Sequence, residues 1–195
     1  MKKIQIKKCY PYTNKNLQLS KQQLHFSYNQ MSNPSSLQDL VNLKGLYLED
    51  NEIIDISPLK SLVSLRELDL SFNEIKDISS LKNLVNINIL YLNSNRISNI
   101  FPLENFVNLE RVNLGNNQIT DISPLKNLIN LKRLDLWNNQ VVDISPLRNL
   151  VNLKELWVEN NPISERQIDE LQKSLPNCKI FYKKRGSVYR ITDVN

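Results

Sequence analysis

The sequence predicts an α/β solenoid in which about eight short parallel strands form a concave sheet, with 3₁₀ turns on the convex side and a capping helix at the C-terminal end. Two observations carry this prediction. Apolar residues and one asparagine recur every 22 residues through six units in strict register, and the last unit continues into a stretch with helical spacing. The first apolar position of the unit is occupied by Leu43, Leu65, Ile87, Leu109, Leu131 and Leu153.

Each unit begins with a short strand. In one unit, Leu134 and Leu136 alternate with polar residues, which predicts a strand with one face inward. Asn139 ends the strand, and its side chain can hydrogen-bond backbone groups that the bend would otherwise leave buried without partners. Ser145 and Pro146 then suit a short helical turn, with Ser145 as its cap and Pro146 in its first turn. The period leaves room on the outer side for one such turn, of the 3₁₀ type.

The repeat continues beyond the six complete units at both ends. One period back lies a degenerate repeat, residues 21–42, with Leu24 inward. One period forward lies a last strand, residues 175–182, with Cys178 and Ile180 inward. We therefore divide the chain into three parts. Residues 1–20 are an N-terminal cap or tail, and residues 21–182 are the repeat domain, whose six complete units span 43–174. Residues 183–195 are a basic C-terminal tail or an edge-covering strand.

A true helix is predicted before the last strand. Ser164 and Gln167 have the spacing of a capping box. Ile168, Leu171 and Leu175 follow at helical spacing. Such a helix replaces the 3₁₀ turn of the last unit and hides the apolar edge that a terminal unit would expose to water.

These units resemble the leucine-rich repeat family, in particular the short subclass of the bacterial internalins and of a eukaryotic regulator of protein phosphatase 1. The motif L-x-x-L-x-L-x-x-N-x-I-x-D-I-S-P-L-x-x-L is nearly complete in the units from Leu43, Leu109 and Leu131, whereas Ser80 replaces the proline in another. The resemblance covers residues 21–182 and implies a leucine-rich repeat horseshoe that recognises another protein. It does not identify the partner, because the same scaffold serves many ligands.

Charge is distributed unevenly and argues against a nucleic-acid partner. The 195-residue chain has a net charge of +5, but residues 1–22 hold six lysines and no acidic residue, and residues 183–195 are also basic. Acidic residues outnumber basic ones between these ends, so the repeat domain lacks the basic stripe that phosphate contacts require. No stretch reaches the roughly 20 apolar residues that span a membrane. We expect neither nucleic acid nor membrane as a partner.

Cysteine usage and the N-terminal residues predict a cytoplasmic location. Cys9 and Cys178 lie at opposite ends of the solenoid, too far apart for a disulfide. The N-terminal lysines are not followed by the apolar run of a signal peptide, so we expect neither the secretion signal nor the wall anchor of internalins. Abundant asparagine with no alanine suggests an AT-rich, bacterial genome. We expect a monomeric, cytoplasmic bacterial protein.

The outward residues of the strands form the candidate binding site. Residues that alternate with the inward leucines face the concave side. The only two tryptophans, Trp137 and Trp157, fall there on adjacent strands, and exposed Trp, Tyr and Arg side chains commonly anchor interfaces. The alternative is that these side chains merely cover the sheet and one another. The predicted partner-binding residues are Tyr47, Glu49, Asp69, Phe72, Tyr91, Arg111, Arg133, Asp135, Trp137, Trp157, Phe181 and Tyr182.

No constellation of residues predicts catalysis. The chain has one histidine, His25, and no nucleophile with the spacing of a catalytic triad. Asp69 and Asp135 occupy equivalent sites three strands apart, about 14 Å, which exceeds the separation of paired glycosidase carboxylates. Glu49 and Glu67 belong to an acidic group that could hold a hard cation, although a solvated acidic face is the favoured interpretation. We expect no enzyme activity, no metal and no cofactor.

We therefore expect a non-catalytic protein–protein interaction module that binds a partner protein on its concave face. Within that class the sequence favours a bacterial intracellular adaptor, inhibitor or immunity- or effector-type protein. The resemblance to the phosphatase regulator leaves a regulatory subunit of a protein phosphatase as one alternative. A structural spacer, or a homo-oligomer formed through the ends, is the other.

Overall fold

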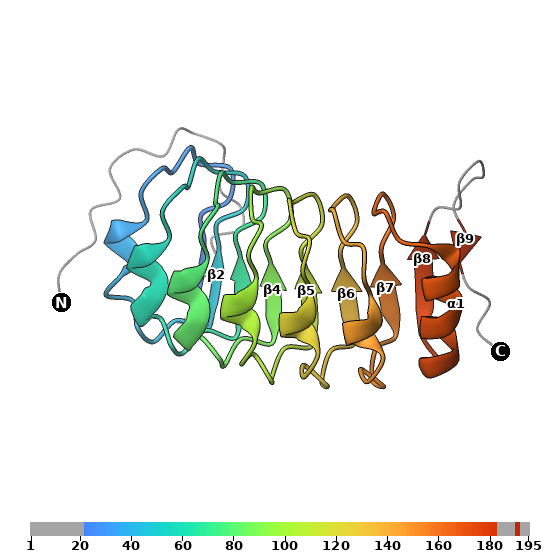
Figure 1. The fold of residues 1–195 in the computed structure, drawn as a ribbon. Coiled ribbons are helices and arrows are strands. Elements are labelled where there is room, and N and C mark those ends of the chain that lie inside the picture. The colour runs from blue at the N-terminus through green and yellow to red at the C-terminus, as the bar shows by residue number, and fades with distance from the viewer. Residues whose placement is uncertain (1–21, 183–189, 192–195) are drawn as a thin grey trace.

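The computed structural model describes residues 22–182 and 190–191, which form one sheet with strands in the order of the chain. Figure 1 shows the strands side by side along one face of an elongated stack and the helical turns along the other. The described strands are β1 Gln23–His25, β2 Gly45–Tyr47, β3 Glu67–Asp69, β4 Ile89–Tyr91, β5 Arg111–Asn113, β6 Arg133–Asp135, β7 Glu155–Trp157, β8 Lys179–Tyr182 and β9 Arg190–Ile191.

Six 3₁₀ turns and one α-helix cover the convex side of the described chain. The turns are η1 Ser35–Leu37, η2 Ser57–Ser61, η3 Ser79–Asn83, η4 Phe101–Leu103, η5 Ser123–Leu125 and η6 Ser145–Leu147, and the helix is α1 Glu165–Ser174. Strands β1 to β8 are parallel in successive pairs. The fold class predicted from the 22-residue period is therefore confirmed. The inward leucines, isoleucines and valines of every unit form one continuous buried core between sheet and turns.

A ladder of asparagines closes the bend after each strand, as predicted. Asn117 Nδ2 donates to the carbonyl oxygens of Leu92 at 3.0 Å, Leu114 at 3.0 Å and Gly115 at 3.3 Å, and its Oδ1 accepts from Ile97 N at 2.9 Å. Each asparagine therefore satisfies buried backbone groups of its own unit and of the preceding one. The same pattern recurs at Asn51, Asn73, Asn95, Asn139 and Asn161.

A second asparagine ladder runs along the turn that leads into each strand. Asn108 Nδ2 donates to the carbonyl oxygen of Val85 at 3.1 Å. These bonds join each unit to the one before it, and they lie at the exposed edge of the stack. This ladder was not predicted from the sequence, although its members recur with the 22-residue period. The other members are Asn86, Asn130 and Asn152.

The prediction that Ser145 caps its convex turn is wrong, because Ile144 occupies the N-cap position of η6 and the side chain that accepts from the first turn is that of Asp143. Ser145 is the first residue of η6 rather than its cap. Its backbone N donates to Asp143 Oδ1 at 2.8 Å, and its Oγ donates to Asp143 Oδ2 at 2.9 Å. A serine at the first position of the turn therefore bonds this aspartate twice. Pro146 occupies the first turn as predicted.

Helix α1 caps the C-terminal end. Ser164 Oγ accepts from Gln167 N at 3.3 Å, but Gln167 Oε1 has no hydrogen-bond partner among the described residues, so only half of the predicted capping box forms. Gln172 Nε2 donates to the carbonyl oxygens of Leu175 at 3.0 Å and Cys178 at 3.1 Å, which ties the helix to β8. Cys178 is buried in the core, and burial raises the pKa of its thiol to about 12.

The register of the last strand differs from the prediction by two residues. Leu156 aligns with Ile180, so this unit spans 24 residues instead of 22. The α-helix that replaces the 3₁₀ turn accounts for the longer connection. A shift of two residues keeps the side chains of residues 178–181 on their predicted faces but changes their neighbours across the strands.

The two ends of the chain are only partly described. The predicted N-terminal cap or tail, residues 1–20, lies outside the described residues, as does Cys9. Within residues 183–195, β9 pairs antiparallel with β8, aligning Ile191 with Phe181. No helix in the described part of the chain is long and apolar enough to cross a membrane.

Candidate functional site

Trp157 lies at the centre of an aromatic group on the C-terminal half of the concave face. Its ring stacks on Phe181 with centroids 3.8 Å apart and planes within 4°. Arg133 Cζ lies 5.6 Å from the centre of the same ring. Arg133 Nη1 also pairs with Glu155 Oε2 at 3.1 Å. Neighbours on β6 and β8 therefore hold the Trp157 side chain in place.

Trp137 lies over Gly115 of the neighbouring strand. A Cβ atom at position 115 would lie 2.1 Å from Trp137 Nε1 and 2.3 Å from its Cδ1, closer than real Cβ contacts. The indole therefore packs on bare backbone that any larger residue would cover. Sequence analysis missed the role of Gly115, although its place beside Trp137 in the same row of outward residues was a usable signal.

Two buried carboxylates are cross-strand neighbours of these indoles, Asp135 beside Trp157 and Glu159 beside Trp137. Asp135 is only 8% exposed and Glu159 only 7%. The pKa of Asp135 is raised to about 6, mainly by burial and to a smaller extent by the charge of Glu159. The hydrogen bond from the Trp137 N–H and the charge of Arg133 oppose this shift. Burial also raises the pKa of Glu159. The expectation that Asp135 is an exposed residue is wrong, because bulky neighbours such as Trp157 cover most of its surface, whereas its role as a contact residue stays a prediction.

A second group lies towards the N-terminal end, on β1 to β3. His25 stacks on Tyr47 with centroids 4.2 Å apart and planes within 4°. The Tyr47 hydroxyl donates a short hydrogen bond to Glu67 Oε2. Burial, together with this bond and the charge of Glu67, raises the pKa of Tyr47 well above its usual value. Strands β4 and β5 separate this group from the tryptophans.

The remaining predicted residues lie on or beside the concave face, with one exception. Asp69 Oδ1 accepts from Ser71 N at 2.9 Å and from Ser71 Oγ at 2.5 Å. Phe72 follows β3 with φ of 53°, which turns the chain away from the sheet and leaves its ring 50% exposed at the rim. Glu49, Tyr91 and Arg111 are at least partly exposed.

Tyr182 is the exception. Sequence analysis placed it just past the last strand among the outward residues. The two-residue shift of β8 gives it instead the inward position of Val158, and it packs against the core. That prediction is wrong because the 22-residue period does not hold through α1.

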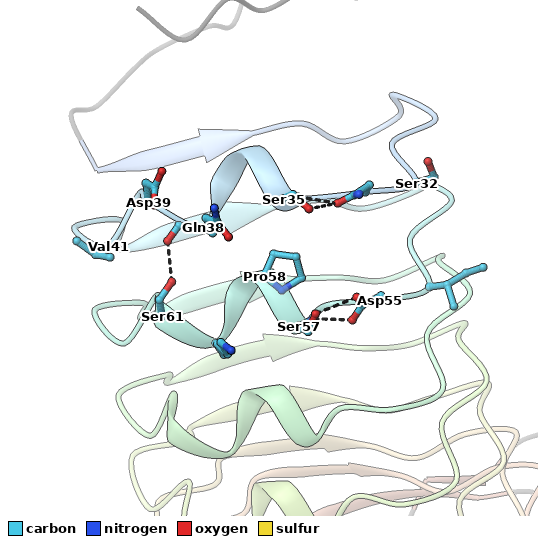
Figure 2. Close-up of a pocket in the computed structure, with 12 residues that line it drawn as sticks. Ser32, Ser35, Gln38, Asp39, Val41, Asp55, Ser57, Pro58 and Ser61 are labelled. Atoms are coloured by element: carbon cyan, nitrogen blue, oxygen red, sulfur yellow. Dashed lines mark hydrogen bonds between the residues drawn. The ribbon is translucent and has the colours of Figure 1, made fainter. Parts of the chain in front are cut away.

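A groove of about 680 Å³ lies on the convex side between the turns η1 and η2. Figure 2 shows that its polar side chains serve local structure: Ser57 bonds Asp55, and Ser61 Oγ donates to the carbonyl oxygen of Gln38 at 2.6 Å. The described residues contain no group of three or more His, Cys, Asp or Glu side chains that could hold a metal ion.

Comparison with known families and structures agrees with this architecture. A family model described as leucine-rich repeats (2 copies) matches residues 41–83, 63–100, 85–127 and 129–173. The crystal structure of internalin C2 from Listeria monocytogenes matches with a TM-score of 0.80 and 34% sequence identity, covering 83% of this chain and 71% of that one. No curated protein sequence matches significantly.

Two further structures extend the comparison to longer proteins. Internalin F from L. monocytogenes matches with a TM-score of 0.76 and 37% identity, covering 82% of this chain and 46% of that one. The ectodomain of a plant membrane receptor kinase from Arabidopsis thaliana, in complex with Casparian strip integrity factor 2, matches with a TM-score of 0.66 and 27% identity. That match covers 73% of this chain and 18% of the receptor, so this chain spans only a part of these two proteins.

Proposed function

The chain belongs to the leucine-rich repeat family and is internalin-like. Because proteins of this family generally mediate protein–protein interactions, we propose that the chain is a non-catalytic module that binds a partner protein on its concave face. Such domains are typically binding modules rather than enzymes. The plant receptor ectodomain, in complex with its integrity factor, supports the proposal as a solenoid of similar fold that binds another molecule.

One observation carries this proposal: the only two tryptophans of the chain lie on the concave face of adjacent units. The repeat does not need them for its core, which is built from leucine, isoleucine and valine columns. Both side chains are partly exposed and held in fixed orientations by Gly115, Arg133 and Phe181. Pre-oriented aromatic side chains lose little conformational entropy on binding and anchor many interfaces.

The distribution of charge on the same face suggests how a partner is oriented. Arg111 is exposed on β5, close to the tryptophans, whereas Glu49 and Asp50 lie at the opposite end of the sheet. Complementary charges increase the rate of association and set the orientation of docking. We expect a partner whose surface carries acidic groups opposite Arg111 and basic groups opposite Glu49.

The finer assignment is a bacterial intracellular adaptor, inhibitor or immunity- or effector-type protein, acting as a cytoplasmic monomer without nucleic-acid or membrane partners. Its support is the similarity to L. monocytogenes internalins and the acidic balance of the repeat domain. Strand β9 supports the monomer, because it occupies the edge of β8 that a strand from a second copy would otherwise pair with. A homo-oligomer through this end is correspondingly disfavoured.

Affinity capture from the native cell tests the proposal. The bait proteins are the wild type, the double variant Trp137→Ala/Trp157→Ala, and a matched control, Ile129→Ala/Val151→Ala, whose residues are 54% and 72% exposed away from the tryptophans. We expect mass spectrometry to find a protein captured by the wild type and the control but lost with the double tryptophan variant. Equal capture by all three would show that the concave tryptophans do not bind the partner.

A further inference from the structure

The two tryptophans and the two buried carboxylates form a square on adjacent units, which we name the carboxylate–indole cluster: Asp135, Trp137, Trp157 and Glu159. The pairing of β6 with β7 aligns Asp135 with Trp157. The same ladder continues past the strands, where Asn138 N donates to the carbonyl oxygen of Glu159 at 2.8 Å. Trp137 and Glu159 are therefore the next outward neighbours. The two carboxylates occupy one diagonal of the square and the two indoles the other.

The polar atoms of the cluster are poorly satisfied. Glu159 Oε2 is buried and has no hydrogen-bond partner within the described chain. Asp135 Oδ1 accepts one long hydrogen bond, from Trp137 N at 3.3 Å. Trp157 Nε1 is also buried, with no partner among the residues that the structure describes. Buried carboxylates without a counter-charge carry a desolvation cost, so a bound group that pairs with them would be favoured.

The other acidic residues within strands β1 to β8 already have partners. Glu67 accepts from the Tyr47 hydroxyl, and Asp69 accepts twice from Ser71. The nearest cation, Arg133, pairs with Glu155 at 3.1 Å. Within the described residues, Asp135 and Glu159 stand out as the buried acidic pair without an ion pair.

The chemistry of the cluster selects its ligand. Two carboxylates on one diagonal repel phosphate and favour a cation. An indole ring attracts a cation through its π electrons, as Arg133 over the Trp157 ring already shows. A metal ion is a poor candidate because the described residues offer no third ligand of the required type. A guanidinium or ammonium group on a flexible stem can reach between the rings and donate several hydrogen bonds.

We propose that the carboxylate–indole cluster binds a basic side chain of the partner protein, an arginine or a lysine, with its charge between Asp135 and Glu159 and its stem against Trp137 and Trp157. This inference rests on the proposed function and names the group that the concave face recognises. The raised pKa of each carboxylate agrees with it, since burial raises both and at Asp135 outweighs the opposing charge of Arg133.

Intrinsic fluorescence reports on this site directly, because the cluster contains both tryptophans of the chain. The probes are three capped tripeptides, acetyl-Gly-X-Gly-amide, in which X is arginine, lysine or citrulline, the neutral analogue of arginine. At pH 7.5 we expect a saturable fluorescence change with arginine or lysine and at least about tenfold weaker binding with citrulline. The stronger of the two cationic peptides identifies the preferred side chain.

Two isosteric variants and one control complete the test. Asp135→Asn and Glu159→Gln remove one charge each, and we expect each to weaken binding of the cationic peptide at least about tenfold. Glu74→Gln removes a carboxylate that pairs with Arg96 at 3.0 Å in another unit, and it should leave binding unchanged. Equal binding of citrulline and arginine, no saturable change up to about 20 mM peptide, or insensitivity to both cluster variants would overturn the proposal.

The outcomes also separate this inference from the proposed function. If the partner is lost with Trp137→Ala/Trp157→Ala but retained with Asp135→Asn/Glu159→Gln, the concave face binds the partner and the cation site is wrong. If the arginine peptide binds as expected while partner capture is insensitive to the tryptophans, the cation site stands and the proposed function fails.

Discussion

The indole of Trp137 packs on the backbone of Gly115, one strand away. A Cβ atom at position 115 would lie 2.1 Å from Nε1 and 2.3 Å from Cδ1 of that ring. The orientation of one exposed tryptophan therefore depends on the absence of a side chain in the neighbouring unit.

Gly115→Ala should displace the Trp137 ring. We expect destabilisation of about 1–2 kcal/mol, because overpacking forces the indole to move, together with a shift in tryptophan emission. Urea unfolding measures the first effect and steady-state fluorescence the second. The matched control is the same substitution in a Trp137→Ala background, where it should cost little. Equal destabilisation in both backgrounds would place the strain in the backbone rather than in the contact with the ring.

Asn117→Ala should be far more costly than Asn108→Ala. Asn117 Nδ2 donates to three carbonyl oxygens and its Oδ1 accepts from Ile97 N, all at a buried bend. Leaving these groups unsatisfied should lower the free energy of unfolding by roughly 2–4 kcal/mol. Asn108 makes one exposed bond to Val85, so its loss should cost about 0.5–1 kcal/mol. Chemical denaturation of both variants decides the point, and similar losses would contradict the role assigned to the buried ladder.

Asp135→Asn should stabilise the protein at neutral pH. The pKa of Asp135 is raised from 3.8 to about 6. The folded state therefore holds the carboxyl proton of Asp135 more tightly than the unfolded state does. Above pH 6, where Asp135 is charged, the carboxylate opposes folding. Two pKa units correspond to about 3 kcal/mol, which solvent screening reduces to a gain of about 1–2 kcal/mol at pH 7.5. The gain should disappear as the pH falls from 6 to below 3.8, as urea unfolding at several pH values would show.

Asp143→Asn provides the control of opposite sign. Hydrogen bonds from Ser145 hold the pKa of Asp143 below its usual value, so its charged form stabilises the fold above pH 3.8, and this contribution is lost on acidification. The variant should therefore be less stable than the wild type at pH 7.5. A destabilised Asp135→Asn protein at that pH would contradict the assignment of an unpaired buried charge.

The period of the sequence was sufficient to predict the strands, the core and the asparagine ladder. Fixed spacing determines which side chains point inward, so Leu134, Leu136 and Asn139 could each be placed correctly. The same argument failed at the last strand, because α1 makes that unit longer and aligns Trp157 with Phe181. The stacking of these two rings was therefore not predictable from counting.

The candidate site was predictable in part, because the repeat period shows which way a side chain points but not which neighbours cover it. Trp137 and Trp157 were placed on the outward face from spacing alone. Whether Asp135 and Glu159 on the same face are exposed depends on how the large rings beside them lie. Trp137 in turn lies where Gly115 allows it, which is a contact between units rather than a property of either. Burial of the two carboxylates is thus a tertiary effect that a repeat pattern does not encode.

The most direct test of the central claim is the dissociation constant of the captured partner, measured by calorimetry. We compare the wild type, Trp137→Ala/Trp157→Ala and the control Ile129→Ala/Val151→Ala, whose exposed residues lie in the turns that lead into β6 and β7. Binding through the concave face requires a loss of at least about 2 kcal/mol, roughly 30-fold, with the tryptophan variant and less than about twofold with the control. A folded tryptophan variant that keeps the wild-type affinity, or a control that loses it, would show that the partner binds elsewhere.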